Sequence, residues 1–573
     1  MKTILHFIKP YKKLIVFTML FMIFDVVGAL YIPKITADMI NNGVINGNME
    51  YIIQKGIIML VVSIVAGIAT IIGTYLTSSL SAKLCADMRK EVYKKSLKLS
   101  NFDFKQLGTA SMITRTLNDV NFIGQGITYF IQMVLPVPFM CIIGIIMAFS
   151  TDKFMGFLII GITAVILIAT VFVTKYASGI FEKLQKFLDK MYSVIRENIT
   201  GVKVIRAFNK EKYESKRMGK SFEDYAKSAI ATNKLFAGLD IFALVVINLT
   251  VVLITWIGGN RVGSGFMQIG DITAVIEYAI LILFYIIMAQ MVIIFIPRAI
   301  VCIRRVQEVL DVEEKIKDGS EEFKNNDTDE IIKFENVTFK YEDADENTLN
   351  NLSFICKKGE TTAIIGSTGS GKSTVAGLIM RFFDVTSGKI LLKNQDIREL
   401  SQKELREHIS YVPQTAWLFS GTIEENLKYG KENASESELE KALQIAQSEF
   451  VMDLEKGIES EVSQGGKNFS GGQKQRLSIA RAIAKKADLY IFDDSFSALD
   501  FKTDSDLRKA LEKEMNDSAV LIIAQRINTI MNANQIIVLN DGKVVGIGKH
   551  DELMENCEIY REIAKSQMKL VEK

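Results

Sequence analysis

Residues 362–382 read TAIIGSTGSGKSTVAGLIMRF, and this stretch decides the fold of the second half of the chain. A strand-like run from Thr362 to Ile365 leads into Gly366–Ser373, which matches the pattern G-x-x-x-x-G-K-[ST]. A helical stretch from Ser373 to Phe382 follows. Glycines let the backbone wrap around phosphate groups with its N–H groups pointing inward, and the N-terminus of the next helix adds partial positive charge. The stretch therefore predicts a phosphate-binding loop in an α/β domain.

A second apolar run, from Leu489 to Phe492, ends in two adjacent acids, Asp493 and Asp494. A strand that ends in an acid beside a phosphate-binding loop is the edge that holds Mg²⁺ in P-loop ATPases. In such loops the lysine, here Lys372, contacts the β- and γ-phosphates, and the hydroxyl, here that of Ser373, binds the metal. We therefore predict ATP and Mg²⁺ as cofactors.

The first half of the chain has a different composition. The sequence is 49% hydrophobic with a mean hydropathy of +0.20, and the apolar residues concentrate before about residue 300. Six runs reach the length of about 20 residues that crosses the roughly 30 Å hydrocarbon core. In lipid, backbone polar groups must be satisfied internally, so we expect these runs to be helices. They are residues 14–34, 57–79, 127–149, 154–174, 235–257 and 273–296.

Lysine and arginine are unevenly distributed among the loops that join these spans. Eight lie from Lys83 to Arg115 and fourteen from Lys175 to Lys234, whereas the other three loops hold one each, Lys55, Lys153 and Arg261. The positive-inside rule then predicts a multi-pass protein of the cell (plasma) membrane, with both termini and the α/β domain cytoplasmic. The two basic segments contain few helix breakers, so we expect the spans to continue as helices beyond the membrane, by roughly 35–40 Å for about 25 residues.

A charged and polar stretch separates the two halves. Residues 313–330 read EEKIKDGSEEFKNNDTDE, which is typical of a linker. After it, strand-like and helix-like segments alternate, as in an α/β nucleotide-binding fold. The predicted architecture is an all-α transmembrane domain with six spans at residues 1–312, a linker at 313–330 and an α/β P-loop ATPase domain at 331–573. The net charge of +2 gives no indication of a nucleic-acid partner, and we expect none.

Residues 469–473 read FSGGQ and resemble the LSGGQ signature of the ABC transporter family, with Phe469 in place of Leu. The resemblance covers the whole chain. Tyr411–Gln414 (YVPQ) matches the family's Q-loop, and Ser497–Asp500 (SALD) matches its D-loop. Residues 101–120 and 197–208 are similar to its two intracellular loops. These motifs imply an exporter-type half-transporter, with six spans followed by one nucleotide-binding domain.

The resemblance also implies a role for individual residues. Two such domains dimerise head to tail, so each ATP lies between one subunit's phosphate-binding loop and the other subunit's signature. Tyr341 stands at the adenine-stacking position, Gln414 senses the metal, and Asp493 holds Mg²⁺ through water. The implied nucleotide-binding residues are Tyr341, Gly366, Ser367, Thr368, Gly369, Ser370, Gly371, Lys372, Ser373, Thr374, Gln414, Ser470, Gly471, Gly472, Gln473 and Asp500, and the implied metal-binding residues are Ser373, Gln414 and Asp493.

Two catalytic positions depart from the family pattern. The residue after Asp493 is normally Glu, which polarises the attacking water, but here it is Asp494. Its shorter side chain places the carboxylate about 1–1.5 Å back, and a displacement of that size can lower the rate about 10²-fold. Gln525 stands where the family usually has His, which contacts the γ-phosphate. The pair implies a degenerate site that binds ATP but hydrolyses it weakly; the alternative is a tolerated substitution at a site that still turns over.

The signature, in contrast, keeps Ser-Gly-Gly-Gln. The chain would then build a weak site with its own loop and complete a good site on a partner. This pattern resembles the degenerate-site subunit of heterodimeric bacterial multidrug exporters. We therefore expect a transport-coupled ATPase that pairs with a second ABC half-transporter and exports a small amphipathic substrate, either drug-like or lipid. The alternatives are a homodimeric exporter, a lipid flippase and an ATP-sensing regulatory membrane subunit.

Three acidic residues fall within or near the spans: Asp25, Asp240 and Glu277. Ionisable groups at such positions are costly and are often functional. One hypothesis is that Glu277 helps to recognise cationic substrates. The alternative is an interfacial position or an ion pair with a neighbouring helix.

Overall fold

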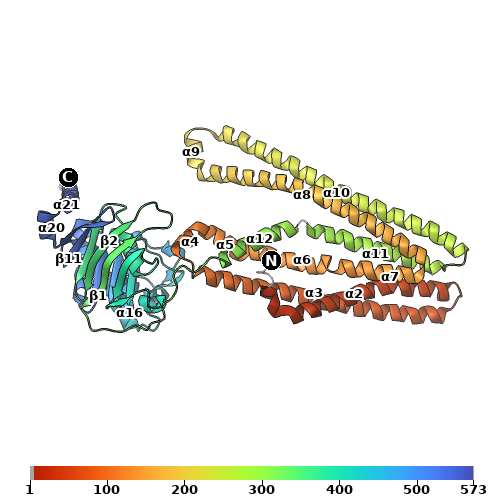
Figure 1. The fold of residues 1–573 in the computed structure, drawn as a ribbon, viewed down its shortest axis with the longest axis horizontal. Helices are drawn as coiled ribbons and strands as arrows, with labels where there is room; N and C mark the ends of the chain where they lie inside the picture. The colour runs from red at the N-terminus through yellow and green to blue at the C-terminus, as the bar shows by residue number, and fades with distance from the viewer. Residues whose placement is uncertain (1–5, 294, 572–573) are drawn as a thin grey trace. The chain divides into compact units, whose positions relative to one another are not determined.

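The computed structural model describes residues 6–293 and 295–571, and the chain divides into two compact units, Met1–Val312 and Glu313–Lys573. We describe each unit by itself (Figure 1). The described residues of the first unit form helices and the turns between them, whereas the second unit combines sheets with helices. The predicted fold class, an α-helical transmembrane domain followed by an α/β domain, is confirmed.

Six helices in the described part of the first unit are long and apolar enough to cross a membrane. The first five predicted spans fall within the helices given below, whereas the sixth, at residues 273–296, begins in the last of them and runs past its end at Ile293. The third span is a helical run with a π-helical turn in its middle, which joins two α-helices. The spans are α2 (Lys12–Asp38), α3 (Met49–Ser96), the run of α6 (Val120–Tyr129), η4 (Phe130–Val134) and α7 (Pro136–Thr151), α8 (Lys153–Thr200), α10 (Glu211–Gly263) and α11 (Ile269–Ile293), after which α12 (Phe295–Leu310) follows.

Three of these helices continue far beyond their apolar parts. α3 and α8 have 48 residues each and α10 has 53. At 1.5 Å per residue, 48 residues extend over about 70 Å, more than twice the hydrocarbon thickness. Short helices, α4 (Asn101–Leu107) and α9 (Val202–Ala207), lie where the long helices end. The predicted helical extensions are therefore present.

In this helical unit, polar side chains cap helix ends and small residues allow helices to pack closely. Asp152 begins α8, because its Oδ1 accepts hydrogen bonds from the backbone N–H groups of Phe154 and Met155. α2 packs against α3, α7 and α11 (Figure 1). The contact between α2 and α3 is close: a Cβ added to Gly28 would lie 2.6 Å from Ala66 Cβ. The buried core between these helices includes Leu30, Met140, Tyr278 and Ile282.

The second unit contains two main sheets and a short strand pair, β7 (Gly421–Thr422) and β8 (Glu461–Val462). The six-stranded sheet has the order β12-β11-β3-β10-β9-β6; its strands are parallel except β12. The four-stranded sheet, β2-β1-β4-β5, is antiparallel. The strands are β1 (Glu330–Phe339), β2 (Leu349–Lys357), β3 (Thr361–Gly366), β4 (Ser387–Leu392), β5 (Gln395–Asp396), β6 (Ile409–Val412), β9 (Leu489–Asp493), β10 (Ala519–Ile523), β11 (Gln535–Asn540) and β12 (Lys543–Gly548).

The centre of the six-stranded sheet positions the site. Every residue of β9 and β10 is buried, as continuous apolar runs in a parallel sheet require. The carboxyl ends of parallel strands meet at one edge of a sheet, so the loops after β3, β9 and β10 lie together there. The helices of this unit are α13 (Lys372–Ile379), α14 (Gln402–Glu407), α15 (Ile423–Lys428), α16 (Glu436–Ile445), α17 (Gly471–Ala484), α18 (Phe501–Glu514), α19 (Ile527–Ile530), α20 (His550–Asn556) and α21 (Glu558–Val571).

Candidate nucleotide site

The phosphate-binding loop joins β3 to α13, as its sequence predicts. Gly371, the N-cap of α13, has a φ of +96°, a left-handed conformation that glycine adopts without steric cost. Gly366 has no room for a side chain, because a Cβ there would lie 2.1 Å from the carbonyl oxygen of Leu539. The two glycines therefore permit the tight turn between β3 and α13.

Lys372 lies folded over this loop. Its Nζ donates hydrogen bonds to the carbonyl oxygens of Gly366 (2.9 Å) and Ser367 (2.7 Å). Burial lowers the pKa of the Lys372 ammonium, and the nearby carboxylates Asp494 and Asp493 oppose that shift. The ammonium is thus held on the phosphate-binding loop by two carbonyl groups that a phosphate oxygen can replace.

Ser373 and Asp493, two of the residues predicted to bind the metal, lie in direct contact. Ser373 Oγ donates a hydrogen bond to Asp493 Oδ1 over 2.9 Å, and Tyr411 Oη donates one to Oδ2 over 3.4 Å. Burial raises the pKa of the Asp493 carboxyl, and the two hydroxyl groups oppose the rise.

These oxygens fit Mg²⁺, which prefers oxygen ligands and is bound through one or two carboxylates together with substrate phosphates. Within the described ranges, no group of three or more His, Cys, Asp and Glu side chains forms a metal cage of its own.

Asp494 is held in an unusual backbone conformation and by two amide groups. Its φ is +48°, which is uncommon for a residue with a side chain. Its Oδ2 accepts one hydrogen bond from Gln525 Nε2 (2.9 Å) and another from Gln414 Nε2 (3.1 Å). Burial raises the pKa of the Asp494 carboxyl, and the hydrogen bond from Gln414 opposes this, as do the charges of Lys372 and Arg526.

The contact among these three side chains was not predicted from the sequence. It follows from the register of the sheet, in which Ile523 of β10 pairs with Asp493 of β9. The residues just beyond the two strands then lie side by side, and the Asp494 N–H donates to the carbonyl oxygen of Ile523 (2.8 Å). Three adjacent parallel strands, β6, β9 and β10, each with a polar side chain one or two residues beyond its end, are the signal that would have found it.

Tyr341 lies beside the phosphate-binding helix. Its hydroxyl is 3.0 Å from Thr374 Oγ1, in the first turn of α13. The Tyr341 ring makes edge contacts with Phe339 and Phe383, with centroid separations of 4.8 and 5.3 Å. The aromatic position expected for the adenine is therefore connected to the loop expected for the phosphates.

The signature residues begin a helix of 14 residues, α17. Ser470 is its N-cap and forms a capping box with Gln473: Gln473 N donates to Ser470 Oγ (3.3 Å), and Ser470 N donates to Gln473 Oε1 (2.9 Å). Ser470 and Gly471 are exposed, and Gly472 is half-buried. In the described part of the chain no hydrogen bond joins these residues to the phosphate-binding loop of the same chain. They present an exposed helix N-terminus, which favours an anion.

Asp500 is engaged as a helix cap. Its Oδ1 accepts from Thr503 N (3.0 Å) and its Oδ2 accepts from Thr503 Oγ1 (2.8 Å) at the start of α18. These hydrogen bonds lower the pKa of the Asp500 carboxyl. The contacts of Asp500 in this structure are local to its own helix.

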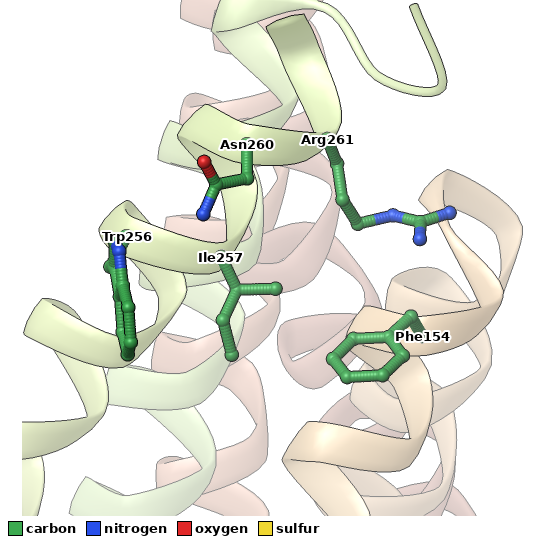
Figure 2. Close-up of a pocket in the computed structure, with 5 residues that line it drawn as sticks. All are labelled: Phe154, Trp256, Ile257, Asn260 and Arg261. Atoms are coloured by element: carbon green, nitrogen blue, oxygen red, sulfur yellow. The ribbon is translucent and has the colours of Figure 1, made fainter. Parts of the chain in front are cut away.

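The transmembrane unit has a small pocket, of about 190 Å³, where α8 begins and α10 ends (Figure 2). Arg261 Nη2 donates to Asp152 Oδ2 over 2.5 Å, and its guanidinium lies over the Phe154 ring. The pocket is open and is lined by Phe154, Trp256, Ile257, Asn260 and Arg261.

The acidic residues of the spans have different surroundings. Asp25 Oδ1 accepts a hydrogen bond from Thr70 Oγ1 of α3 over 2.5 Å. Glu277, on α11, is exposed, with no ion pair among the described residues. The side chain of Asp240 lies outside the part of the chain that the structure describes.

Known proteins resemble the chain in both units. A family model for the ABC transporter transmembrane region matches residues 15–287, and a model for the ABC transporter domain matches residues 349–497. An uncharacterized ABC transporter ATP-binding protein of Mycobacterium tuberculosis is 34% identical over 568 residues, 98% of this chain and 97% of the relative. The uncharacterized ABC transporter ATP-binding protein YfiB of Bacillus subtilis is 33% identical over 571 residues, 99% of this chain and 98% of the relative.

A solved structure of a bacterial Atm1-family ABC exporter with ATP bound has a similar fold. The TM-score is 0.81, and the match covers 97% of this chain and 99% of that chain at 23% sequence identity. This likeness supports the fold of the whole chain.

Proposed function

The chain belongs to the ABC transporter family, with a transmembrane region and an ATP-binding domain in one polypeptide, and we propose that it drives the export of a small amphipathic substrate, drug-like or lipid. The support is the fusion of six apolar helices with a nucleotide site in one chain. ATP binds one conformation of such a protein more tightly than another, and this difference in affinity shifts the protein between conformations that open the substrate pathway to different sides of the membrane. We propose export as the direction of transport because the solved structure with a similar fold is that of an exporter.

We further propose that this chain is the weakly hydrolysing half of a heterodimer. The observation that carries the proposal is the double hydrogen bond from Gln414 and Gln525 to Asp494 Oδ2. Both amides donate to the same oxygen, so they occupy the lone pairs with which Asp494 Oδ2 would accept a proton from water, although burial raises the pKa of this carboxyl. An amide at position 525 also carries no positive charge toward a γ-phosphate. Water at this site would be activated poorly, and the nucleotide would be retained.

The proposed roles of the loop residues follow from their contacts. Lys372 leaves the carbonyl groups of Gly366 and Ser367 and contacts the β- and γ-phosphates. Ser373 and Asp493 hold Mg²⁺, which when bound neutralises charge that develops on the phosphates. The proposed nucleotide-binding set is Tyr341, Gly366, Ser367, Thr368, Gly369, Ser370, Gly371, Lys372, Ser373, Thr374 and Gln414.

Gln414 has two possible partners in this scheme. In the structure its amide nitrogen is directed to Asp494 (3.1 Å). To act as a metal-sensing residue it must turn its amide oxygen toward the Ser373–Asp493 side of the site. We propose that Gln414 exchanges Asp494 for the metal when nucleotide binds.

The exposed signature is the basis for the proposed partner. Ser470, Gly471 and Gly472 would contact ATP held by a second ABC half-transporter, with Gln473 and Asp500 beside them. That partner would carry the consensus Glu and His. The proposed location is the cell membrane, with both termini and the ATP-binding domain in the cytoplasm, on the strength of the lysine and arginine distribution.

Nucleotide retention tests this proposal. The purified transporter, with its native partner, would be incubated with Mg²⁺-ATP and washed, and the bound nucleotide would be identified by mass spectrometry. The account predicts unhydrolysed ATP, lost in Lys372→Ala but kept in Lys358→Ala, because Lys358 pairs on the surface with Asp517. Retention of ADP alone would contradict the degenerate site.

One observation favours a second candidate. The same chain carries both a complete phosphate-binding loop and an intact signature, so two copies could build two equal sites. The second candidate is therefore a homodimeric exporter with two slow sites. The subunit composition of the purified transporter separates the two candidates.

A further inference from the structure

Residues 315–326, here called the linker strap, lie against the ATP-binding domain. The composition of residues 313–330 predicts a linker, and the structure shows that its middle is docked. The Gly319 and Glu321 N–H groups donate to the carbonyl oxygens of Leu400 and Glu399, both over 3.0 Å. Glu321 and Leu400 form a parallel β-bridge. The strap thus adds a short strand-like segment to the domain.

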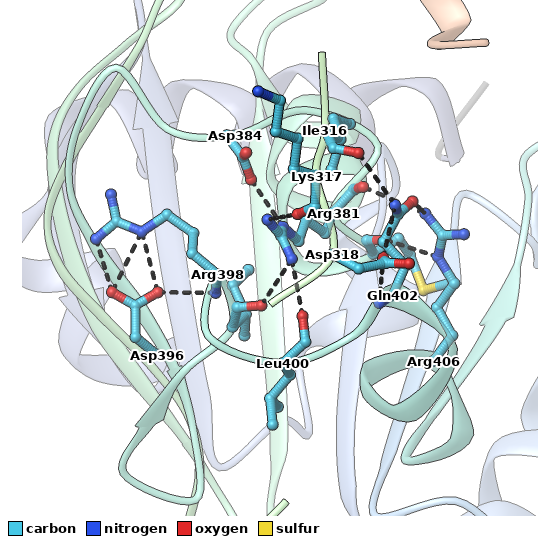
Figure 3. A network of polar contacts seen from close by, with 12 residues as sticks. Ile316, Lys317, Asp318, Arg381, Asp384, Asp396, Arg398, Leu400, Gln402 and Arg406 are labelled. Carbon is cyan, nitrogen blue, oxygen red and sulfur yellow. Dashed lines mark hydrogen bonds and ion pairs between the residues drawn. The ribbon is translucent and has the colours of Figure 1, made fainter. Parts of the chain in front are cut away.

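Arg381 is the main anchor of the linker strap (Figure 3). It is 3% exposed, and its guanidinium donates to the carbonyl oxygens of Lys317 (2.8 Å), Leu400 (3.0 Å) and Ile397 (3.3 Å) and to Asp384 Oδ1 (2.9 Å). A buried guanidinium that loses a partner is strongly destabilised. Because the Arg381 guanidinium is buried, water could not replace the Lys317 carbonyl as its hydrogen-bond acceptor, and this favours a docked strap.

A second contact lies beside Arg381 in the same network. Asp318 Oδ1 accepts hydrogen bonds from the backbone N–H of Gln402 (3.0 Å) and from its side-chain Nε2 (3.1 Å). Arg406 Nη2 donates to Gln402 Oε1 (3.0 Å) and to the carbonyl oxygen of Arg381 (3.2 Å). Figure 3 shows Arg381, Gln402 and Arg406 grouped around Lys317 and Asp318 of the strap.

The anchors belong to the two elements that would hold the nucleotide. Arg381 directly follows Met380, the C-cap of α13, and α13 begins with Lys372 of the phosphate-binding loop. On the adenine side, Lys315 Nζ donates to both carboxylate oxygens of Glu342 (2.6 and 2.8 Å), the neighbour of Tyr341. A nucleotide bound between Tyr341 and the phosphate-binding loop would therefore influence both attachments of the strap, the one at Arg381 and the one at Glu342.

Docking also shortens the connection to the transmembrane unit. If free, the 18 residues of 313–330 could span about 60 Å. With Lys317 anchored, only residues 311–316 separate this anchored residue from the end of α12 at Leu310, a reach of about 25 Å at most. A movement of α13 would then be passed to α12 through a short tether.

We propose that the linker strap is a coupling element that passes the nucleotide state of this chain's ATP site to helix α12; this rests on the ATP-driven transport proposed above. Arg381 is a positioning residue in this device. Bound ATP makes the hydrogen bonds between the strap and the ATP-binding domain open less often, and the strap stays attached during transport. Loss of docking separates ATP hydrolysis from substrate movement.

Hydrogen exchange of the complete transporter tests the first part. Peptides that cover residues 316–324 are compared with and without Mg²⁺-ATP, and ATP binding is measured separately. Slower exchange of these amides with ATP supports the proposal. Unchanged exchange in protein that has bound ATP overturns it. The readout needs no transport, so it remains decisive if the proposed export is wrong.

Gly319→Ala tests the second part. A Cβ at Gly319 would lie 1.9 Å from the Glu399 carbonyl oxygen, so alanine must displace the strap. The control is Ser320→Ala, an adjacent exposed position. Transport of a fluorescent cationic dye per ATP hydrolysed should fall about 2- to 30-fold in Gly319→Ala, with ATPase activity unchanged. A parallel fall of both rates would indicate a merely structural role and overturn the proposal.

Asp318→Ala provides a second route to the same result. Asp318 is exposed, and its removal leaves the domain core intact while it deletes both contacts to Gln402. The variant should reproduce the uncoupling of Gly319→Ala. Full coupling in both variants would overturn the proposal, whereas absence of transport in the parent protein would count against the proposed function alone.

Discussion

Gln525 donates a hydrogen bond from Nε2 to Asp494 Oδ2 over 2.9 Å, and these residues stand at the two catalytic positions that depart from the family pattern. The departures are therefore direct partners. Gln414 donates to the same oxygen over 3.1 Å. Residues in one hydrogen-bond network do not contribute additively, so the two positions must be tested together.

Restoring both positions should restore hydrolysis. We expect Asp494→Glu combined with Gln525→His to raise ATP hydrolysis at this chain's site by up to about 10²-fold, because the carboxylate would move back toward the water. The measurement is ATPase activity with the partner's site inactivated. Gln525→His alone is the control and should give a smaller gain. No gain in the double variant would show that the explanation of weak hydrolysis is wrong.

Ser470 and Ser435 offer a matched pair of helix caps. Each forms a capping box with a residue three positions later, Gln473 and Glu438. Ser470→Ala and Ser435→Ala should each lower the free energy of unfolding by about 1 kcal/mol. Only Ser470→Ala should also lower ATPase activity, because its helix would meet ATP held by the partner. Equal ATPase activity in the two variants would refute the proposed role of the signature.

Asp25 offers a test of substrate charge. Asp25→Asn keeps an acceptor for Thr70 Oγ1 but removes the charge. We expect transport of a cationic dye to fall about fivefold if the carboxylate attracts the substrate, because a hydrogen bond to a charged group is stronger than a neutral one by about that factor. Transport of a neutral dye should be unaffected. Thr70→Val, which keeps the charge, is the control, and Glu277→Gln tests the earlier hypothesis in the same assay. Equal loss for both dyes in Asp25→Asn would show a structural role.

The buried Asp493 carboxyl makes stability depend on pH. Burial raises its pKa in the folded protein, so its contribution is favourable at acid pH and is lost as pH rises through the folded pKa. Asp493→Asn keeps an acceptor for Ser373 but does not ionise. We expect a higher Tm than the parent for the nucleotide-free protein at neutral pH, with the difference shrinking toward about pH 4.

The control for this pH dependence is Asp517→Asn, since that side chain is 96% exposed and its surface pair with Lys358 contributes little. An Asp493→Asn variant with the parent's Tm at every pH would contradict the burial argument. The same variant should bind Mg²⁺-ATP more weakly, because a carboxylate ligand is lost.

Local patterns predicted much of the fold. The apolar run predicted as a strand at Leu489–Phe492 forms β9 (Leu489–Asp493), because an apolar run between polar segments determines it alone. The six spans were also predicted, since length and hydropathy decide them. The contact of Asp494 with Gln414 and Gln525 was not, because it depends on the register of β9 and β10 and on a left-handed residue.

The docking of residues 315–326 also could not be predicted from composition. Charged and polar residues there indicate a linker, but Arg381 binds the backbone carbonyl of Lys317, which every residue type carries. Gly319 gives a close approach to Glu399 that becomes visible only when the two segments are placed together. Hydrogen bonds to backbone carbonyl groups, and close contacts between two backbone segments, cannot be identified from the residue types of a single sequence.

The subunit composition of the transporter tests the central claim most directly. The tagged chain would be purified from its native membrane in mild detergent, and the subunits would be counted by mass spectrometry. The account predicts one stoichiometric second half-transporter that carries Glu and His at the positions of Asp494 and Gln525. A preparation that contains only copies of this chain would contradict it, and those two residues would then have to support turnover unaided.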